Sequence, residues 1–201
     1  MGDPIMETGV AGRGRSPGLS RELIFRLRGL IPVPAALIVI AWSNPSFESI
    51  AYGAIFLLIG EAIRVWAAGY IQVYRVAAVG ADRLVTAGPY AFVRNPLYWG
   101  NFLIGLGYAH SANWWPAYLI FGALYLYIYS SVIPHEEEYL SRTFKDDYAS
   151  YRKSVPRFLP RLSRYPGANG RFSFGVAIRS EVMTLATIGV MMALFAVKAL
   201  I

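Results

Sequence analysis

Residues 114–133 read WWPAYLIFGALYLYIYSSVI, a run of twenty residues that contains no Asp, Glu, Lys or Arg. A helix of about 20 apolar residues is long enough to cross the hydrocarbon core of a bilayer. Backbone polar groups in that core must be bonded internally, so a spanning segment of this kind is expected to be an α-helix. Four further apolar runs accompany it, at residues 23–43, 47–71, 96–111 and 181–201. The sequence therefore predicts an all-α integral membrane protein with about five transmembrane helices.

The composition is typical of a membrane protein. Of the 201 residues, 56% are hydrophobic and 15% are charged, whereas a soluble domain carries about 25% charged residues. The absence of cysteine excludes disulfide scaffolds, thiolate metal sites and cysteine nucleophiles. The two histidines, His110 and His135, are far apart in the sequence, so we expect no metal site.

The formal net charge of +7 is compatible with either nucleic acid or a membrane surface as partner. Five of the nineteen Lys and Arg residues precede residue 29, three lie in 72–96 and nine lie in 134–180. Basic segments are retained on the cytoplasmic side of a membrane, and five spans with the N-terminus inside place all three segments there. We therefore expect an integral protein of a bacterial-type inner membrane, with membrane lipids but no nucleic acid as partners. The oligomeric state stays open.

Two charged residues lie in the interior of the second apolar run. Glu61 and Arg64 are three residues apart, so they can meet on one face of a helix. Charges at membrane depth are unfavourable and face a bundle interior. The pair predicts either a contact to substrate or cofactor, or an ion pair that packs helices together. The nearby glycines Gly105 and Gly107 lack the βαβ context of a nucleotide-binding loop and indicate close helix packing.

The segment before the third run is rich in polar residues. It reads DRLVTAGPYAFVRNPLYWGN over residues 82–101, and its Gly and Pro residues break any long helix. Irregular backbone at a membrane is tolerated only where it is buried in protein or lines a cavity. Arg94, Asn95, Tyr98 and Asn101 then recur at helical spacing toward the third run. This density of polar side chains at one helix entry favours a pocket over an ordinary interfacial belt.

Residues 135–160, HEEEYLSRTFKDDYASYRKSVPRFLP, predict a cytoplasmic amphipathic helix that can lie on the bilayer. Glu136 shares the apolar stripe of this helix, which is unfavourable unless a positive or polar group meets it, and Glu137 follows it. Because both come soon after Pro134, a second interpretation is that they stabilise a helix start. The apolar stripe consists of Leu140, Phe144, Tyr148, Tyr151 and Val155.

Together these motifs resemble the isoprenylcysteine carboxyl methyltransferase family, which includes phospholipid-methylating relatives. The family pattern places Leu-Val, Gly, Tyr and Arg-His-Pro-x-Tyr-x-Gly before a transmembrane hairpin, and a Glu-Glu series with a Pro-Arg-rich end after it. The resemblance covers about residues 72–160 in matching order and spacing. The residues that carry it are Leu84, Val85, Gly88, Tyr90, Arg94, Asn95, Pro96, Tyr98 and Gly100, followed by Glu136, Glu137, Leu140, Phe144, Tyr148, Tyr151 and Val155 to Pro160.

The resemblance implies an integral membrane methyltransferase that moves a methyl group from S-adenosylmethionine to a lipophilic acceptor entering from the bilayer. It also implies a cytoplasmic cofactor pocket that the segment after the hairpin closes. From the chemistry, Glu137 could hold a cationic acceptor or take its proton, and Arg94 or Arg157 could pair with the methionine carboxylate of the cofactor. The residues that the resemblance places on the cofactor are Asp82, Arg83, Leu84, Val85, Tyr90, Asn95, Pro96, Leu97, Tyr98 and Glu136.

Three positions depart from the family pattern. Asn95 replaces the usual His and cannot carry a proton near neutral pH. Lys145 replaces a Gly, and Val132 stands where carboxyl-methylating relatives carry an Arg. The acceptor therefore stays open among a carboxylate, an amine, a thiol and a phenol. Two other functions also stay open, an NADPH-dependent membrane reductase of the sterol-reductase type and a catalytically inactive membrane relative.

Composition and resemblance together divide the chain into five parts. The third and fourth runs should pair as a tight hairpin around residues 110–113, and the last helix lies beyond the family core. The parts are a flexible N-terminal tail at 1–22, a two-helix transmembrane hairpin at 23–71, the methyltransferase core with its cofactor pocket at 72–160, a cytoplasmic linker at 161–179 and a C-terminal transmembrane helix at 180–201.

Overall fold

The computed structural model describes residues 19–71 and 83–201, and every regular element within them is helical. Among these residues, three helices are long and apolar enough to cross a membrane: α3 (Phe47–Ala68), α5 (Pro116–Ser154) and α6 (Phe174–Ala199). The prediction of an all-α membrane protein is confirmed. The count of five spans is not confirmed, because two of the expected spans form shorter helices, α2 (Pro32–Trp42) and α4 (Pro96–Ser111).

The first apolar run does not form one continuous helix. α1 (Leu19–Leu27) ends before Arg28, and α2 begins at Pro32. Proline has no N–H group and is favoured in the first turn of a helix, so Pro32 starts a new helix rather than extending the previous one. α1 begins inside the stretch 1–22 that the sequence predicts as a tail, and residues 1–18 lie outside the described residues.

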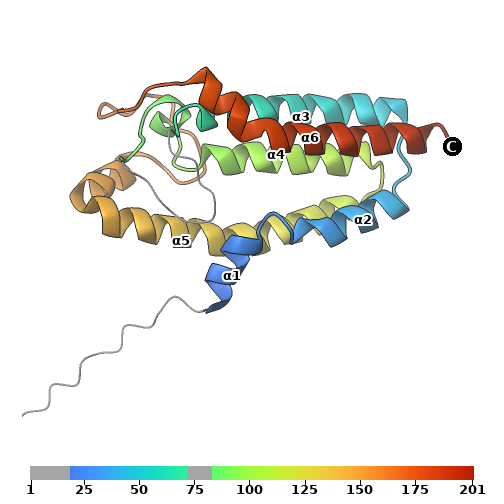
Figure 1. Ribbon diagram of the computed structural model, residues 1–201, viewed down its shortest axis with the longest axis horizontal. Helices are drawn as coiled ribbons and strands as arrows, with labels where there is room; N and C mark the ends of the chain where they lie inside the picture. The colour runs from blue at the N-terminus through green and yellow to red at the C-terminus, as the bar shows by residue number, and fades with distance from the viewer. Residues whose placement is uncertain (1–18, 72–82) are drawn as a thin grey trace, which may run out of the picture.

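α3, α4 and α6 lie side by side in one layer, and α5 and α2 form a second layer beside them (Figure 1). α3 and α4 approach so closely that only glycine fits between their backbones. A Cβ atom on Gly60 would lie 2.8 Å from the carbonyl oxygen of Gly100, and one on Gly107 would lie 2.8 Å from that of Gly53. The prediction that Gly107 packs helices is confirmed, and Gly105 packs against α5 instead.

α4 and α5 form the expected hairpin. Its turn contains Asn113 at a φ of 48°, in the left-handed region that asparagine tolerates better than most residues. α5 then continues through Pro134, so Glu136 and Glu137 lie in mid-helix. The interpretation that these carboxylates stabilise a helix start is therefore wrong, and their burial requires polar or positive partners elsewhere.

α5 leaves helical geometry at Lys145, where φ is 40° and ψ is −111°. Glycine adopts such a conformation more readily than lysine does, and this is the position at which the family pattern has Gly. Beyond it, the apolar stripe of the helix packs against Leu84 and Tyr165. The second half of α5 thus covers the segment that precedes α4.

α6 begins at Phe174, so it includes the last residues of the stretch 161–179 that was expected as a linker. The start of α4, the second half of α5 and the start of α6 gather at one end of the bundle (Figure 1). The C-terminus lies at the opposite end. Segments from distant parts of the sequence therefore lie together at a single end of the molecule.

Candidate active site

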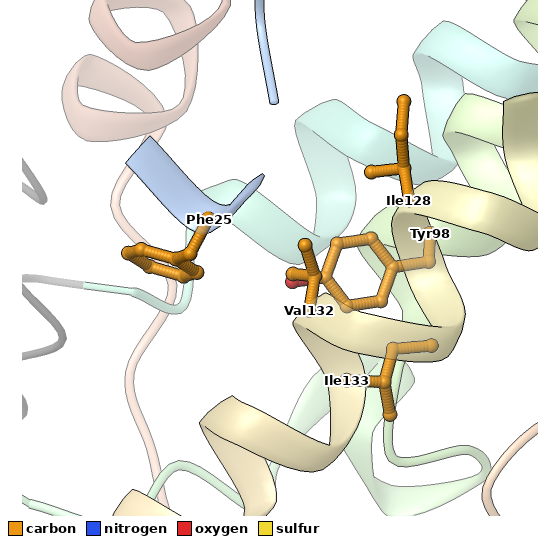
Figure 2. Close-up of a cluster of buried hydrophobic side chains, with 5 residues drawn as sticks. All are labelled: Phe25, Tyr98, Ile128, Val132 and Ile133. Atoms are coloured by element: carbon orange, nitrogen blue, oxygen red, sulfur yellow. The ribbon is translucent and has the colours of Figure 1, made fainter. Parts of the chain in front are cut away.

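Tyr98 and Glu136 meet between α4 and α5. The hydroxyl of Tyr98 donates to Oε2 of Glu136 at 2.5 Å, and both side chains are buried. The ring of Tyr98 lies in an apolar cluster with Phe25 of α1 and Val132 of α5 (Figure 2). Both residues are among those that the resemblance places on the cofactor, and the structure brings them into contact.

Glu137, the next residue of α5, is held by two arginines. Its Oε1 accepts a hydrogen bond from Nε of Arg157 at 3.1 Å and lies 3.3 Å from Nη2 of Arg94. Its Oε2 accepts from Nη2 of Arg157. The side chains of Arg94 and Glu137 are buried, whereas that of Arg157 is 39% exposed. Because two guanidinium groups face one carboxylate, this cluster has an excess positive charge and favours a further anion.

Buried donors without a partner surround this cluster. Among the described residues, Nε and Nη1 of Arg94 and the hydroxyl of Tyr148 have none. Burial, followed by the charge of Glu137, raises the pKa of Tyr148 to about 12, so its hydroxyl remains a neutral donor at pH 7. The hydrogen bond to Glu137 raises the pKa of Arg157. An unsatisfied buried donor costs about 1–3 kcal/mol, and an anionic ligand would remove that penalty here.

The segment that follows α5, residues 155–170, closes over the entry to α4. The backbone N–H of Arg94 donates to the carbonyl oxygen of Pro156 at 2.9 Å. Nδ2 of Asn95 donates to the carbonyl oxygen of Arg157 at 3.2 Å. Asn95 thus serves as a donor to this closing segment, a role that needs no ionisable side chain.

The other residues that the resemblance places on the cofactor differ in burial. Asn95 and Pro96 are buried at the start of α4, and Arg83 is exposed. Asp82 lies outside the described residues. Four are half-buried: Leu84, Val85, Tyr90 and Leu97. The buried polar groups therefore concentrate around α4 and the middle of α5.

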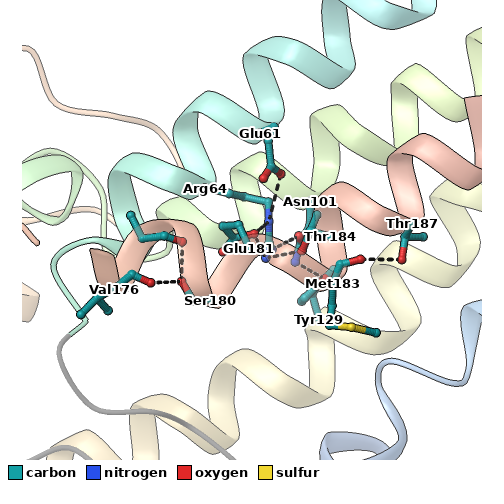
Figure 3. Close-up of polar contacts among 11 residues, drawn as sticks. Glu61, Arg64, Asn101, Tyr129, Val176, Ser180, Glu181, Met183, Thr184 and Thr187 are labelled. Atoms are coloured by element: carbon teal, nitrogen blue, oxygen red, sulfur yellow. Dashed lines mark hydrogen bonds and ion pairs between the residues drawn. The ribbon is translucent and has the colours of Figure 1, made fainter. Parts of the chain in front are cut away.

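A second polar cluster lies among the membrane-spanning helices (Figure 3). Arg64 of α3 donates from Nε and Nη2 to Oε2 of Glu181 in α6, at 2.9 and 2.6 Å. Its Nη1 donates to Oδ1 of Asn101 in α4, and Glu61 lies 3.8 Å from its Nε. Asn101 in turn donates from Nδ2 to the hydroxyl of Tyr129 in α5 at 2.7 Å. These contacts support the interpretation of Glu61 and Arg64 as charges that pack helices.

Sequence reasoning missed two members of this cluster. Glu181 counted only as the first residue of the last span, although a carboxylate at the head of an apolar run is a signal for a buried cationic partner. Nothing in the sequence distinguishes Tyr129 from the other tyrosines of the fourth run. Among the residues that the structure describes, no group of three or more His, Cys, Asp or Glu side chains could hold a metal ion.

Three relatives with assigned names are similar to parts of this chain. Cobalt-zinc-cadmium resistance protein CzcN of Cupriavidus metallidurans is 30% identical over 63% of this chain and 55% of that protein. Nickel-cobalt-cadmium resistance protein NccN of Alcaligenes xylosoxydans xylosoxydans is 36% identical over 51% of this chain and 45% of that protein. Protein-S-isoprenylcysteine O-methyltransferase of Schizosaccharomyces pombe is 40% identical over 39% of this chain and 34% of that protein.

The matched stretches thus span about half or less of the length of these relatives. No solved structure matches the chain. The model of the phospholipid methyltransferase family matches residues 49–147, which contain Arg94, Tyr98, Glu136 and Glu137. Through this region, from α3 into the second half of α5, the chain matches the phospholipid methyltransferase family.

Proposed function

We propose that the protein transfers a methyl group from S-adenosylmethionine to a lipophilic acceptor that reaches the site from the bilayer. The observation that carries this proposal is the set of buried, unpartnered donors on Arg94 and Tyr148 beside the positively charged cluster at Glu137. They lie next to the Tyr98–Glu136 pair along α5. The match to the phospholipid methyltransferase family supports methyl transfer as the reaction.

The residues of this site fit the polar groups of the cofactor. The free donors of Arg94 and the hydroxyl of Tyr148 match its methionine carboxylate. Glu136 matches its ammonium group, with Tyr98 holding the carboxylate in place. Both oxygens of Glu137 are engaged by guanidinium groups, so we assign Glu137 to orienting Arg94 and Arg157 rather than to proton transfer.

When bound, S-adenosylmethionine provides an electrophilic methyl group, whose bond to sulfur breaks as the bond to the acceptor forms, leaving a neutral thioether. The chain's own residues then have to align the two reactants and exclude water. The closing segment 155–170, bonded to Arg94 and Asn95, covers the site on one side. An acceptor that is already ionised requires no base, which agrees with the loss of the family's usual His at Asn95.

Calorimetric titration of the purified chain in detergent tests the cofactor. We expect S-adenosylmethionine to bind the wild type, and Glu136→Ala and Tyr98→Ala to abolish that binding, since each removes one partner of the buried pair. The matched control is Glu138→Ala, because Glu138 is an exposed residue of the same helix that pairs with Arg142. Absence of binding to the wild type contradicts the proposal, and protection by NADPH in its place favours the reductase.

The site is assigned to the cytoplasmic face by the distribution of basic residues. Since the chain has no cysteine, single cysteines report its orientation without background. Asp146→Cys, at the site end of α5, should be labelled by an impermeant maleimide only from the cytoplasm. Asn44→Cys, in the turn between α2 and α3, should be labelled only from outside, and the reverse pattern would overturn the assignment.

A further inference from the structure

A cavity of about 230 Å³ lies between α2, α4, α5 and α6. Its apolar walls include Ala36 of α2, Ile104 of α4, Phe121 of α5 and Met191 of α6. α2 and α6 lie outside the residues that match the family model. The chain therefore builds this cavity partly from elements that the family core does not include.

One end of the cavity carries a cation, Arg28. Arg28 lines the cavity from the break between α1 and α2, where Pro32 starts the second helix. Its guanidinium carbon lies 4.0 Å from the ring centre of Phe25, and its Nη1 is 3.5 Å from the carbonyl oxygen of that residue. Among the described carboxylates, none forms an ion pair with Arg28. A half-buried guanidinium next to apolar walls favours an anion in the cavity.

The hydroxyl of Tyr129 adds a donor at the same end. Oδ1 of Asn101 accepts from Arg64, so the other end of that amide, Nδ2, donates to the oxygen of Tyr129. The proton of the Tyr129 hydroxyl is then free to be donated elsewhere. Asn101 and Tyr129 both line the cavity. Through Asn101, Arg64 thus leaves Tyr129 as a donor in the same cavity as Arg28.

This end of the cavity adjoins the candidate active site. The ring centres of Tyr129 and Tyr98 are 4.6 Å apart, and the hydroxyl of Tyr125, which also lines the cavity, donates to the carbonyl oxygen of Tyr98 at 3.0 Å. Phe25, which carries Arg28 over its ring, packs in the same cluster as Tyr98 (Figure 2). A molecule held here has its polar end close to the Tyr98–Glu136 pair.

We propose that this cavity binds an anionic amphiphile. Its acidic group, a carboxylate or a phosphate, pairs with Arg28 and accepts from Tyr129, and its hydrocarbon chain lies against Ile104, Phe121 and Met191. The identification of this amphiphile with the methyl acceptor rests on the proposed function, whereas the binding site itself does not.

The test measures the thermal unfolding of the full chain in a neutral maltoside detergent, without cofactor, while decanoate, decyl phosphate or decanol is titrated. Decanoate or decyl phosphate should raise the melting temperature, and decanol should not. Arg28→Gln should weaken the binding of the acid about tenfold to a hundredfold, the effect of one charge-assisted hydrogen bond. Tyr129→Phe should weaken it severalfold. Stabilisation by only one of the two acids identifies the headgroup and supports the site.

Two matched controls separate the cavity from general effects. Arg26→Gln makes the same charge change on the exposed side of α1 and should leave binding intact. Ala36→Phe fills the cavity and should abolish binding, whereas Ala51→Phe, at an exposed position of α3, should not. Equal stabilisation by decanol, or unchanged binding in Arg28→Gln, overturns the inference. Because S-adenosylmethionine is titrated separately, loss of amphiphile binding alone refutes this site and leaves the proposed function standing.

Discussion

Arg64 is the one cation, among the described residues, in the membrane cluster that contains Glu61 and Glu181. Replacing it and replacing Glu181 should therefore have unequal effects on stability. Arg64→Met leaves two buried carboxylates with no positive partner. Glu181→Gln leaves Arg64 with Glu61 at 3.8 Å and keeps a neutral acceptor in front of its guanidinium. Comparing the stabilities of these two variants tests whether the three charged residues act together to hold α6 against α3.

The structure sets the size of the two effects. Glu61 and Glu181 are 7% and 2% exposed, and removing one partner of a buried ion pair lowers the free energy of unfolding by about 3–5 kcal/mol. This is the loss expected for Arg64→Met. Weakening charge-assisted hydrogen bonds gives a loss of about 1.5–3 kcal/mol, which is expected for Glu181→Gln. The triple variant Glu61→Leu, Arg64→Met, Glu181→Leu should recover most of the loss, because apolar replacement of a whole buried ion group is close to neutral.

Reversible unfolding in mixed micelles, followed by tryptophan fluorescence as the fraction of denaturing detergent rises, measures these differences. Glu138→Gln is the control, since its pair with Arg142 is exposed and should contribute less than about 1 kcal/mol. Equal losses for Arg64→Met and Glu181→Gln would refute the reasoning. So would a triple variant that is no more stable than Arg64→Met, because that result would mean that the unpaired carboxylates are not the source of the loss.

Two further predictions concern the second half of α5. Lys145→Gly should raise the free energy of unfolding by about 1 kcal/mol, because glycine adopts the positive φ of 40° without strain. Its control is Ala149→Gly, in regular exposed helix, which should lower the free energy of unfolding by about 0.5–1 kcal/mol in the same assay. A loss of stability in both variants would contradict the strain at Lys145. Tyr148→Phe removes a buried hydroxyl without a partner, so stability at pH 7 should rise by about 1 kcal/mol, while the affinity for S-adenosylmethionine falls. Burial raises the pKa of Tyr148 to about 12, against about 10 in an unfolded chain. The unfolded state therefore loses this proton first as the pH rises. The free energy of unfolding of the wild type then falls by about 1.4 kcal/mol per pH unit between pH 10 and 12. Denaturation of both proteins at pH 7 and pH 11 should show this extra slope in the wild type alone, and a variant that is less stable at pH 7 would contradict the unpartnered hydroxyl.

Local pattern was sufficient for most of the helices. The apolar runs predicted α3, α4, α5 and α6. The position of Glu136 on an apolar stripe indicated that it needs a polar or positive partner, and the structure provides Tyr98. Pattern misjudged the helix break at Pro32 and the continuity of α5 through Pro134. Both errors have the same cause: a proline can begin a helix or lie within one, and packing against neighbouring helices decides which.

The sequence by itself determined which segments are apolar enough to cross a membrane and which are polar. Hydrophobicity and the placement of charge are properties of single residues and their neighbours in the chain, so no tertiary contact is needed to recognise them. The all-helical class and the apolar spans follow from this pattern, and the resemblance to a family follows from the motif residues between 84 and 160. Only the tertiary structure decided which polar groups share a site: Arg64 with Glu181, more than a hundred residues later, and Arg28 with Tyr129 at one cavity. Partners so distant in the chain leave no periodic signal, since their meeting depends on how whole helices pack, and that packing is set by the glycine contacts and apolar surfaces of the assembled bundle.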